Sequence, residues 1–575
     1  MSMPRSIVGV SALAAAALFA ACASSHPSTD VAASGVPATL PLKYSGPATT
    51  PAITAGDLMT RLYVFADDSM MGREAGTEGH MRGTAYIERE LRRMELEPAG
   101  DNGTFFQNVP FISRRFSPTA TLSVDGATLT ALQDYVTGSF RGAYPRPLDG
   151  VQAVYGGVAG DTVNTISAAQ AAGKLVVLTT NGAQQFRLAP GSPLAGAAAV
   201  AIVAGPTLSA PIMAQGRAAS MTLRPTPGAP AVATTLFVTR SAAERLLGAA
   251  LDGMAVGTTG KTVTATPQFV EADAPTRNVV AVLRGSDPAL RGEFVAIGAH
   301  SDHIGLRAAG PVDHDSLHVY GTRRWFATEN PTGRRLTPEE QRMVQASVSA
   351  IRVNVDSLRA LRPARRDSIN NGADDDGSGT VTVLEVAQAF AGAPVKPKRS
   401  LLFVWHTGEE KGLLGSRWFT DHPTVPRDSI VAQINIDMVG RGAAADLAAG
   451  GPRYLQLVGS RRLSTELGDL TETVNRGEPM PFTFDYAFDA NGHPENIYCR
   501  SDHYNYARYG IPVVFLTTGL HGDYHQVTDE PQYIDYPHMA RIATFVRDLA
   551  QRVADLDHRP VVDKPKPDPM GSCRQ

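Results

Sequence analysis

The order of apolar and polar positions predicts alternating strands and helices after residue 278. Apolar runs predict strands at Val279–Leu283, Glu293–Ala299, Ser400–Trp405, Val431–Ile436 and Pro512–Thr517. Helical periodicity predicts helices at Thr380–Phe390, Gly415–Thr420 and Met539–Val553. Strands that alternate with helices indicate an α/β layer fold with a largely parallel sheet.

The region before residue 278 has two parts of different character. Within residues 51–134, Gly79–Met94 has helical periodicity, and Gly100–Val109 predicts a turn followed by a strand. Between residues 135 and 268, charges are sparse and short apolar runs such as Leu175–Leu178 stand between Gly and Pro. This second part predicts a small β-rich domain inserted into the chain.

Residues 304–370 form a long excursion within the predicted α/β region. Its centre, Thr337–Arg362, is amphipathic and predicts a helix, with "TPEE" at 337–340 as a helix N-terminal signature. A lid over a binding site and a surface decoration are both compatible with such a segment.

The first residues predict a secretory signal over 1–22. Arg5 supplies a positive start, Ile7–Phe19 is apolar, and two alanines precede Cys22. The segment resembles a bacterial lipoprotein signal, which implies that Cys22 becomes a lipidated first residue. Ordinary cleavage after Ala23 is the alternative. We therefore expect an exported protein, either a lipoprotein on the periplasmic side of a bacterial membrane or a periplasmic or secreted protein.

Two segments predict flexible chain: a linker over 23–50, rich in Ser, Pro, Thr and Ala, and a tail over 556–575, rich in Lys, Pro and Asp. The sequence has three cysteines. If Cys22 is processed, Cys499 and Cys573 remain, and they either pair or stay apart. Two cysteines are too few for a disulfide framework or a Cys-rich zinc site.

Size and charge narrow the class of protein. A chain of 575 residues predicts two or more domains. The formal net charge is -3 and no basic run is present, so we expect no nucleic-acid partner. Beyond the signal, no segment has the ~18 continuous apolar residues of a membrane span, so a lipid on Cys22 is the expected membrane contact.

Histidine and acidic residues gather in five short strings, most of them at or just beyond the end of a predicted strand. The strings are "GAHSDHIG" (298–305), "GADDDGSG" (372–379), "HTGEEKGLLGS" (406–416), "INIDMVG" (434–440) and "DYHQVTD" (523–529). Ligands of open α/β sheets bind beyond the carboxyl ends of the strands, so we expect the strings to meet at one edge. Imidazole and carboxylate are ordinary ligands of zinc.

The number and spacing of these side chains fit two metal ions. A pair of ions needs a bridging carboxylate and further ligands on each side. His300 and Asp302 project the same way on an extended segment, so the Asp302 carboxylate can accept a hydrogen bond from the ring of His300. Glu409 and Glu410 diverge, so one can face a metal and the other the reacting water.

Other interpretations of the same strings are weaker. A calcium loop at "GADDDGSG" would need ligands where Gly372 and Val383 stand. The "SDH" triplet at 501–503 resembles part of a serine triad, but no GxSxG elbow accompanies it. We interpret His303 and His521 as flanking polar residues rather than ligands.

Taken in order, the five strings resemble the co-catalytic zinc aminopeptidases of metallopeptidase family 28, which also includes glutamate carboxypeptidase and glutaminyl cyclase. The resemblance covers about 53–125 and 272–555. It implies a three-layer aminopeptidase-type fold with a mixed, largely parallel sheet, formed by residues 51–134 and 269–555. The strings "AGKLVVLTTNG", "AGAAAVAIVAG" and "PAVATTLFVTRSAAERLL" resemble a protease-associated domain, which implies that residues 135–268 form one.

The resemblance also implies a role for each site residue, with two zinc ions per chain. His300 would hold one ion and His525 the other, Asp375 would bridge the two ions, and Glu410 would complete one site and Asp437 the other. It implies that Glu409 is the general base, that Asp302 orients His300, that Tyr524 stabilises the tetrahedral intermediate and that Arg500 contacts substrate.

The implied function is hydrolysis of N-terminal peptide bonds in peptide substrates. A dipeptidase, a carboxypeptidase and a glutaminyl cyclase are alternatives on the same site. A binding protein that acts through the protease-associated domain is the alternative from another class. The pattern predicts neither the oligomeric state nor the preferred side chain.

Overall fold

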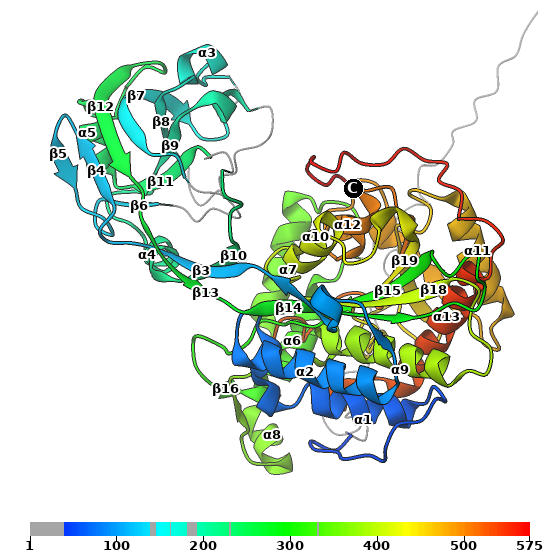
Figure 1. Cartoon of the computed structure of the whole chain (residues 1–575). Helices are drawn as coiled ribbons and strands as arrows, with labels where there is room; N and C mark the ends of the chain where they lie inside the picture. The colour runs from blue at the N-terminus through cyan, green and yellow to red at the C-terminus, as the bar shows by residue number, and fades with distance from the viewer. Residues whose placement is uncertain (1–39, 138–144, 162, 181–191, 229–231, 331–332) are drawn as a thin grey trace, which may run out of the picture.

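The structure is a computed structural model that describes residues 40–137, 145–161, 163–180, 192–228, 232–330 and 333–575. Figure 1 shows a larger body and a smaller lobe joined by a narrow arm. The signal segment and Cys22 lie outside the described residues, so export and lipidation stay predictions. Among the described helices, none combines the length and apolar character needed to cross a membrane.

The larger body is built on a nine-stranded sheet in the order β1-β14-β18-β15-β19-β22-β20-β21, with β2 also paired to β14. Its central strands β18, β15, β19 and β22 are parallel, and β14 and β20 flank them antiparallel. The sheet is therefore mixed with a parallel centre, as predicted. The strands are β1 (Glu97–Pro98), β2 (Phe106–Val109), β14 (Thr276–Leu283), β15 (Phe294–His300), β18 (Ser400–His406), β19 (Ile430–Ile436), β20 (Tyr454–Val458), β21 (Thr483–Asp485) and β22 (Val513–Thr517).

Helices cover both faces of this sheet. Side chains alternate along each strand, so Ile297 packs in one apolar cluster with α9 and α13, while its neighbour Ala296 packs in another with Phe419 and Tyr506. Figure 1 shows α1, α2, α9 and α13 on one side and α10 and α12 on the other. The three-layer α/β prediction is confirmed. The helices are α1 (Ala55–Phe65), α2 (Glu78–Arg93), α9 (Gly379–Gly392), α10 (Leu414–Asp421), α11 (Thr465–Gly477), α12 (His503–Ala507) and α13 (Tyr536–Ala554).

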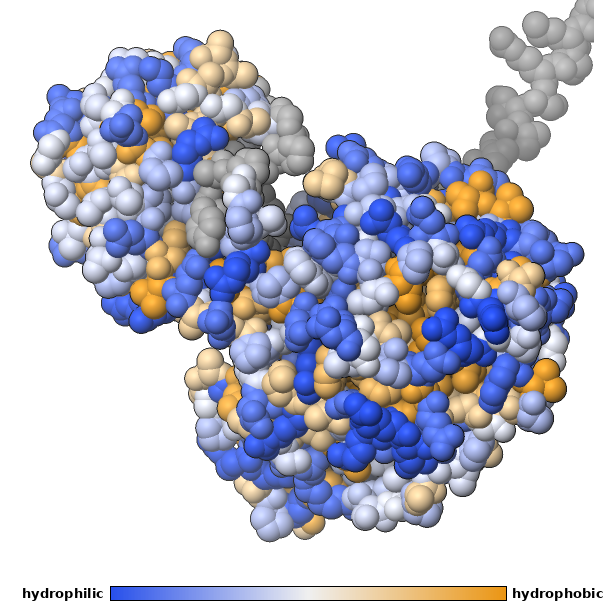
Figure 2. Space-filling model, in the orientation of Figure 1, coloured by the Kyte–Doolittle hydropathy of each residue, from blue (hydrophilic) through white to orange (hydrophobic). Residues whose placement is uncertain are grey.

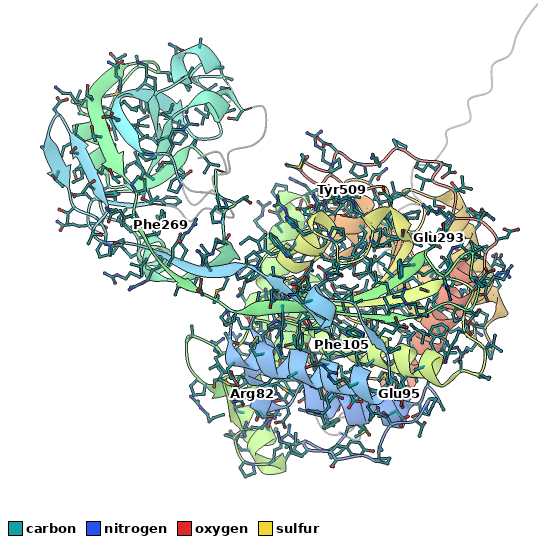
Figure 3. All side chains as sticks on the ribbon, viewed as in Figure 1. Arg82, Glu95, Phe105, Phe269, Glu293 and Tyr509 are labelled. Carbon is teal, nitrogen blue, oxygen red and sulfur yellow. A yellow bond between two sulfur atoms is a disulfide. The ribbon has the colours of Figure 1, made fainter. Side chains whose placement is uncertain are left out.

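A three-stranded sheet in the order β10-β3-β13 forms the arm. β3 (Phe111–Phe116) leads out to the lobe, and β13 (Phe269–Asp273) leads back to the larger body. Phe116 pairs with Phe269 at the end of the arm that joins the lobe. Figure 3 labels Phe269 at this junction. The third strand, β10 (Ser220–Leu223), comes from the inserted segment and returns to the arm.

The lobe is an eight-stranded sheet in the order β5-β4-β12-β7-β8-β9-β11-β6. It starts near residue 117 rather than at the predicted 135, because β4 pairs with β12 of the lobe and not with the body. The strands are β4 (Thr121–Val124), β5 (Ala127–Leu129), β6 (Tyr135–Thr137), β7 (Leu148–Val158), β8 (Leu175–Thr179), β9 (Ala199–Val203), β11 (Thr234–Val238) and β12 (Thr259–Thr266); its helices are α3 (Ala168–Ala171), α4 (Ala210–Arg217) and α5 (Arg240–Leu247).

The excursion after residue 304 contains three helices instead of the single one predicted over 337–362: α6 (His314–Thr328), α7 (Pro338–Ala350) and α8 (Val355–Leu361). The capping box of Thr337 and Glu340 confirms the predicted start of α7. The helix then stops, and the Asn354 side chain accepts from the backbone N–H of Ser357 to begin α8. The ends of the excursion pair as β16 (Val312–Asp313) and β17 (Arg366–Asp367).

The segment 556–575, expected to be a flexible tail, lies against the larger body. Cys573 forms a disulfide with Cys499. Arg508 donates to the carbonyl of Pro569, and the backbone N–H of Asp563 donates to the carbonyl of Leu463. Figure 2 shows that the visible face of both bodies is mostly polar with apolar patches between.

Candidate metal centre

The predicted ligands meet at the carboxyl ends of the parallel strands. His300 is the last residue of β15, and Asp437 follows β19 directly. Asp375 lies in the loop before α9, Glu410 follows β18, and His525 lies in the loop after β22. Sequence positions more than two hundred residues apart are therefore neighbours, as the strand-end rule predicts.

His300, Asp375 and Asp437 form the first donor group, with ligand atoms all within 4.8 Å of one another. The Nε2 atom of His300 lies 3.2 Å from Oδ1 of Asp375 and 3.6 Å from Oδ1 of Asp437. All three residues are buried. One imidazole and two carboxylates facing a common point suit a divalent cation with nitrogen and oxygen ligands.

A second donor group lies on the other side of Asp375. Nε2 of His525 is 3.0 Å from Oδ2 of Asp375 and 3.0 Å from Oε2 of Glu410. The two oxygens of Asp375 therefore face different groups, Oδ1 toward His300 and Oδ2 toward His525. A carboxylate placed in this way is suited to bridging two ions.

His303 also belongs to this second group, so its interpretation as a flanking residue is wrong. Its Nδ1 lies 2.9 Å from Oε1 of Glu410 and 3.7 Å from Oδ2 of Asp375, and its ring packs edge-on against His525. The chain turns after β15 and brings a second histidine of "HSDH" inward. The signal was present in the string, but strand alternation gives no direction for a residue beyond the strand end.

Asp302 contacts His300 in a different way from the one predicted. Nδ1 of His300 lies 3.0 Å from the backbone carbonyl of Asp302, to which it donates, whereas the nearer carboxylate oxygen is 3.8 Å away. That carboxylate accepts from the backbone N–H of Glu409. The carboxylate prediction is wrong because β15 ends at His300, so residue 302 no longer follows the extended alternation.

Several supporting residues escaped the sequence prediction. Ser501 donates to Oδ2 of Asp437, at 2.7 Å. Arg73 is fully buried and donates to the carbonyls of Ser301, Asn371 and Gly372, which flank the ligand loops. Ser501 belongs to the "SDH" triplet at 501–503, whereas Arg73 lies in none of the five strings.

His521 lies outside both donor groups, as predicted from the sequence. Its Nε2 is 3.2 Å from Oδ2 of Asp374. Asp374 also accepts from the backbone N–H of Gly440. These contacts tie the loop after β22 to the loop before α9.

Glu409, Tyr524 and Arg500 line the same pocket as the first donor group. Oε2 of Glu409 is 4.0 Å from Nε2 of His300. The ring of Tyr524 stacks on His525, and its hydroxyl accepts from Arg500 at 3.4 Å. The remaining pocket wall is mainly apolar and includes Phe488, Ile497, Phe515 and Leu520.

The clustered carboxylates of this site favour the binding of a cation. Burial lowers the pKa of His525, but the carboxylates of Asp375 and Glu410 raise it to about 10. Burial raises the pKa of Glu409 well above its ordinary value, and that of Asp302 to about 6. Carboxylates crowded at this density are stabilised by a bound metal ion.

Among the residues that the structure describes, several buried atoms of these groups contact one another at ion-pair distances without forming a hydrogen bond. They are Nδ1 of His303, Oδ2 of Asp375, Oε1 of Glu410 and Nε2 of His525. Buried polar atoms are nearly always hydrogen-bonded, so atoms that lack a hydrogen bond and face one point fit metal ligation. The residues of both groups therefore fit a pair of zinc ions.

Residues 352–550 match peptidase family M28. The chain carries a peptidase family M28 domain. The domain includes Asp375, Glu410, Asp437 and His525, while His300 lies before its matched start.

Curated relatives of this chain include fungal proteins named leucine aminopeptidase 1. The one from Paracoccidioides brasiliensis (strain Pb03) is 30% identical over 208 residues, which are 33% of this chain and 51% of the relative. The one from Ajellomyces dermatitidis (strain ER-3 / ATCC MYA-2586) is 33% identical over 217 residues, 34% of this chain and 52% of the relative. The chain thus spans about half the length of the relatives it matches.

Solved structures similar to this chain include an aminopeptidase from Aneurinibacillus sp. strain AM-1, with 15% identity, a TM-score of 0.45, and coverage of 90% of this chain and 97% of that one. A zinc aminopeptidase from Bacillus subtilis has 15% identity, a TM-score of 0.41, and coverage of 87% and 95%.

Proposed function

We propose that the protein is a zinc-dependent aminopeptidase that hydrolyses the N-terminal peptide bond of peptide substrates. The position of Asp375 carries the proposal, because its two oxygens face two donor groups of histidine and carboxylate. His300 and Asp437 would hold one zinc ion, and Glu410 and His525 the other. His303 is close enough to Glu410 to complete the second group.

Two bound zinc ions supply an activated water and a polarised carbonyl. The protein supplies the proton transfer. Glu409 lines the pocket beside the first donor group without belonging to it, so it can take a proton from the attacking water and deliver it to the leaving amine.

Tyr524 and Arg500 would act on the substrate rather than on the metals. The Tyr524 hydroxyl lies in the pocket, and Arg500 donates to it. Tyr524 can therefore donate to the oxygen that becomes negative in the transition state. The Arg500 guanidinium donates to the Tyr524 oxygen, which leaves the hydroxyl proton of Tyr524 free to be donated to the substrate.

An aminopeptidase fits the pocket and the relatives better than the other reactions. The names of the fungal relatives support aminopeptidase action. The apolar wall beside the ligands suits the side chain of an N-terminal residue. Dipeptidase, carboxypeptidase and glutaminyl cyclase activity on the same ligands are the outcomes that the test must separate.

We further propose that the lobe is a protease-associated domain and that the protein acts after export. The lobe lies at the end of an arm (Figure 1), and the arm joins β14 on the side of the sheet where β15 and β18 end. A lobe so placed can select or position substrates without supplying ligands. The sequence signal before residue 40 supports export.

The test combines metal analysis with a substrate panel on the full chain. We expect about two zinc ions per chain, turnover of aminoacyl-nitroanilides, and no turnover of their N-acetylated forms. Chelation should abolish activity and zinc should restore it. Cleavage of N-acetylated peptides from the carboxyl end, or cyclisation of an N-terminal Gln peptide as the main reaction, would contradict the proposal.

A further inference from the structure

One short stretch of chain supplies much of the apolar pocket wall. Residues 486–500 include Phe488, Ile497 and Arg500, all of which line the pocket. Its regular structure consists of two single turns, η6 (Ala487–Asp489) and η7 (Ile497–Cys499). The backbone N–H and C=O groups of such a stretch need partners elsewhere in the molecule to stay in one arrangement.

Gln575 provides four of these partners. Its Nε2 donates to the carbonyls of Phe488 and Ala490, at 2.5 and 2.9 Å. Its Oε1 accepts from the backbone N–H of Tyr498 at 2.9 Å, and its backbone carbonyl accepts from Gly492 at 3.2 Å. One residue thereby joins both halves of the wall, the half at Phe488 and the half at Tyr498.

Cys573 acts on the same stretch through a covalent bond and through packing. Its disulfide partner, Cys499, stands between Ile497 and Arg500. The two cysteines also pack against the buried apolar cluster that contains Ile497 and Phe515. The contacts of residues 573–575 therefore fall on the pocket wall and not on the donor groups.

We infer that Cys573 and Gln575 are positioning residues that fix the apolar wall of the pocket and, through it, the preference for the substrate's N-terminal side chain. The inference rests on the proposed function, because that function makes the pocket a side-chain site. A loosened wall loses contact with a large apolar side chain and matters little to a small one. Changes at Cys573 and Gln575 should leave metal binding as it is, because neither residue contacts a member of either donor group.

The test compares leucyl- and alanyl-nitroanilide on the full chain. In Gln575→Ala and Cys573→Ser, we expect the ratio of kcat/KM for leucine over alanine to fall about tenfold, the lower end of what one methylene is worth in an apolar pocket. The loss should lie in KM for the leucyl substrate, with zinc content and alanyl turnover unchanged.

Two further variants sharpen the result. Gln575→Glu keeps an acceptor for Tyr498 but sets a carboxylate against two carbonyls, so its loss of selectivity should equal or exceed that of Gln575→Ala. Arg574→Ala is the matched control, since Arg574 is exposed between the two positioning residues. It should keep the wild-type ratio.

Amide hydrogen exchange measures the stability of the pocket wall independently of enzyme turnover. The amide of Tyr498 should exchange faster in Gln575→Ala than in Arg574→Ala, because its acceptor is the side-chain oxygen of Gln575, which alanine lacks. Variants that keep both the wild-type ratio and the wild-type exchange overturn the inference alone. A wild-type protein that turns over neither substrate overturns the proposed function, and the assigned preference with it.

Discussion

Four parallel strands form the centre of the sheet in both the larger body and the lobe. In the body they are β18, β15, β19 and β22; in the lobe they are β7, β8, β9 and β11. In the body, β15 ends at His300 and β19 leads directly into Asp437, whereas in the lobe β8 and β11 lead into Thr180 and Thr239. Within the described chain, the groups able to hold a metal all lie in the body. Parallel topology supplies a place for a site, and the residues that follow the strands decide its chemistry.

Histidine marks the same difference. The printed sequence has no histidine between His80 and His300, a span that contains the whole lobe. No histidine of the lobe can therefore gain or lose a proton in the pH range where imidazole titrates. The body can respond to pH and to metal, so each can be perturbed while the lobe serves as an internal reference.

The largest expected effect comes from substitutions at Glu409 and Glu410. These residues are adjacent in the larger body, but their substitutions should impair the enzyme in different ways. Glu409→Gln removes the proposed base and should lower kcat by at least ~10²–10⁴-fold with zinc content unchanged. Glu410→Ala removes a proposed ligand and should lower zinc content as well. Metal stoichiometry and steady-state kinetics on both variants check this. The assignment is reversed if Glu409→Gln is the variant that loses zinc.

Ser501→Ala should produce the next largest effect. It removes the hydrogen bond that holds Asp437, and loss of such a partner typically weakens metal affinity by ~10–100-fold. Competition with a zinc chelator measures the change. Ser123→Ala in the lobe is the control and should bind zinc like the wild type. Equal affinity in both variants would show that Asp437 needs no support.

Acid should destabilise the body more than the lobe. Burial lowers the pKa of His80 and His406 to about 3, while an unfolded histidine has a pKa of ~6.5. Between these values the unfolded chain binds more protons, so stability is lost as the pH falls from ~6.5 toward ~3. From pH 7 to 5, each such histidine costs the body up to about 2 kcal/mol of unfolding free energy.

Urea titrations at the two pH values test this difference. The three tryptophans, Trp325, Trp405 and Trp418, all lie in the body, so their fluorescence reports its unfolding. Limited proteolysis with peptide mapping reports the lobe. His80→Gln should reduce the acid sensitivity of the body, and the exposed His558→Gln should not. A lobe that loses as much stability as the body would contradict the prediction.

Removing the lobe should have the smallest effect on the site. Because Phe116 and Phe269 are paired, an Asn-Gly turn between them replaces residues 117–268 with a hairpin. The variant loses β10, whose Met221 and Leu223 pack beside Phe111, so its thermal stability should fall. Zinc content should stay at the wild-type value. A folded variant that binds no zinc would show that the two parts are not independent.

Apolar runs predicted the parallel centre of the sheet, and the strings that follow those runs predicted that His300, Asp375, Glu410, Asp437 and His525 would meet at one edge; their assignment as ligands came from the family resemblance and remains a proposal. It misplaced the start of the lobe, since β4 and β5 read equally well as part of the body until their pairing is known. It missed His303 because a turn rather than a strand sets its direction. The pairing of Cys499 with Cys573 depends on a tail whose composition suggested mobility. Local patterns thus gave the elements, and long-range contacts gave the corrections.

The bond between Cys499 and Cys573 also sets an order of events in biosynthesis. The partners are separated by 74 residues, and synthesis at ~5–20 residues per second makes this roughly 4–15 s. During that interval Phe488 and Ile497 already exist, but the residues that clamp them do not. His525 is also made before Cys573, so a nascent chain holds every proposed metal ligand before its pocket wall is secured. Synthesis therefore completes the set of proposed metal ligands before it supplies Cys573 and Gln575, the residues proposed to hold the pocket wall.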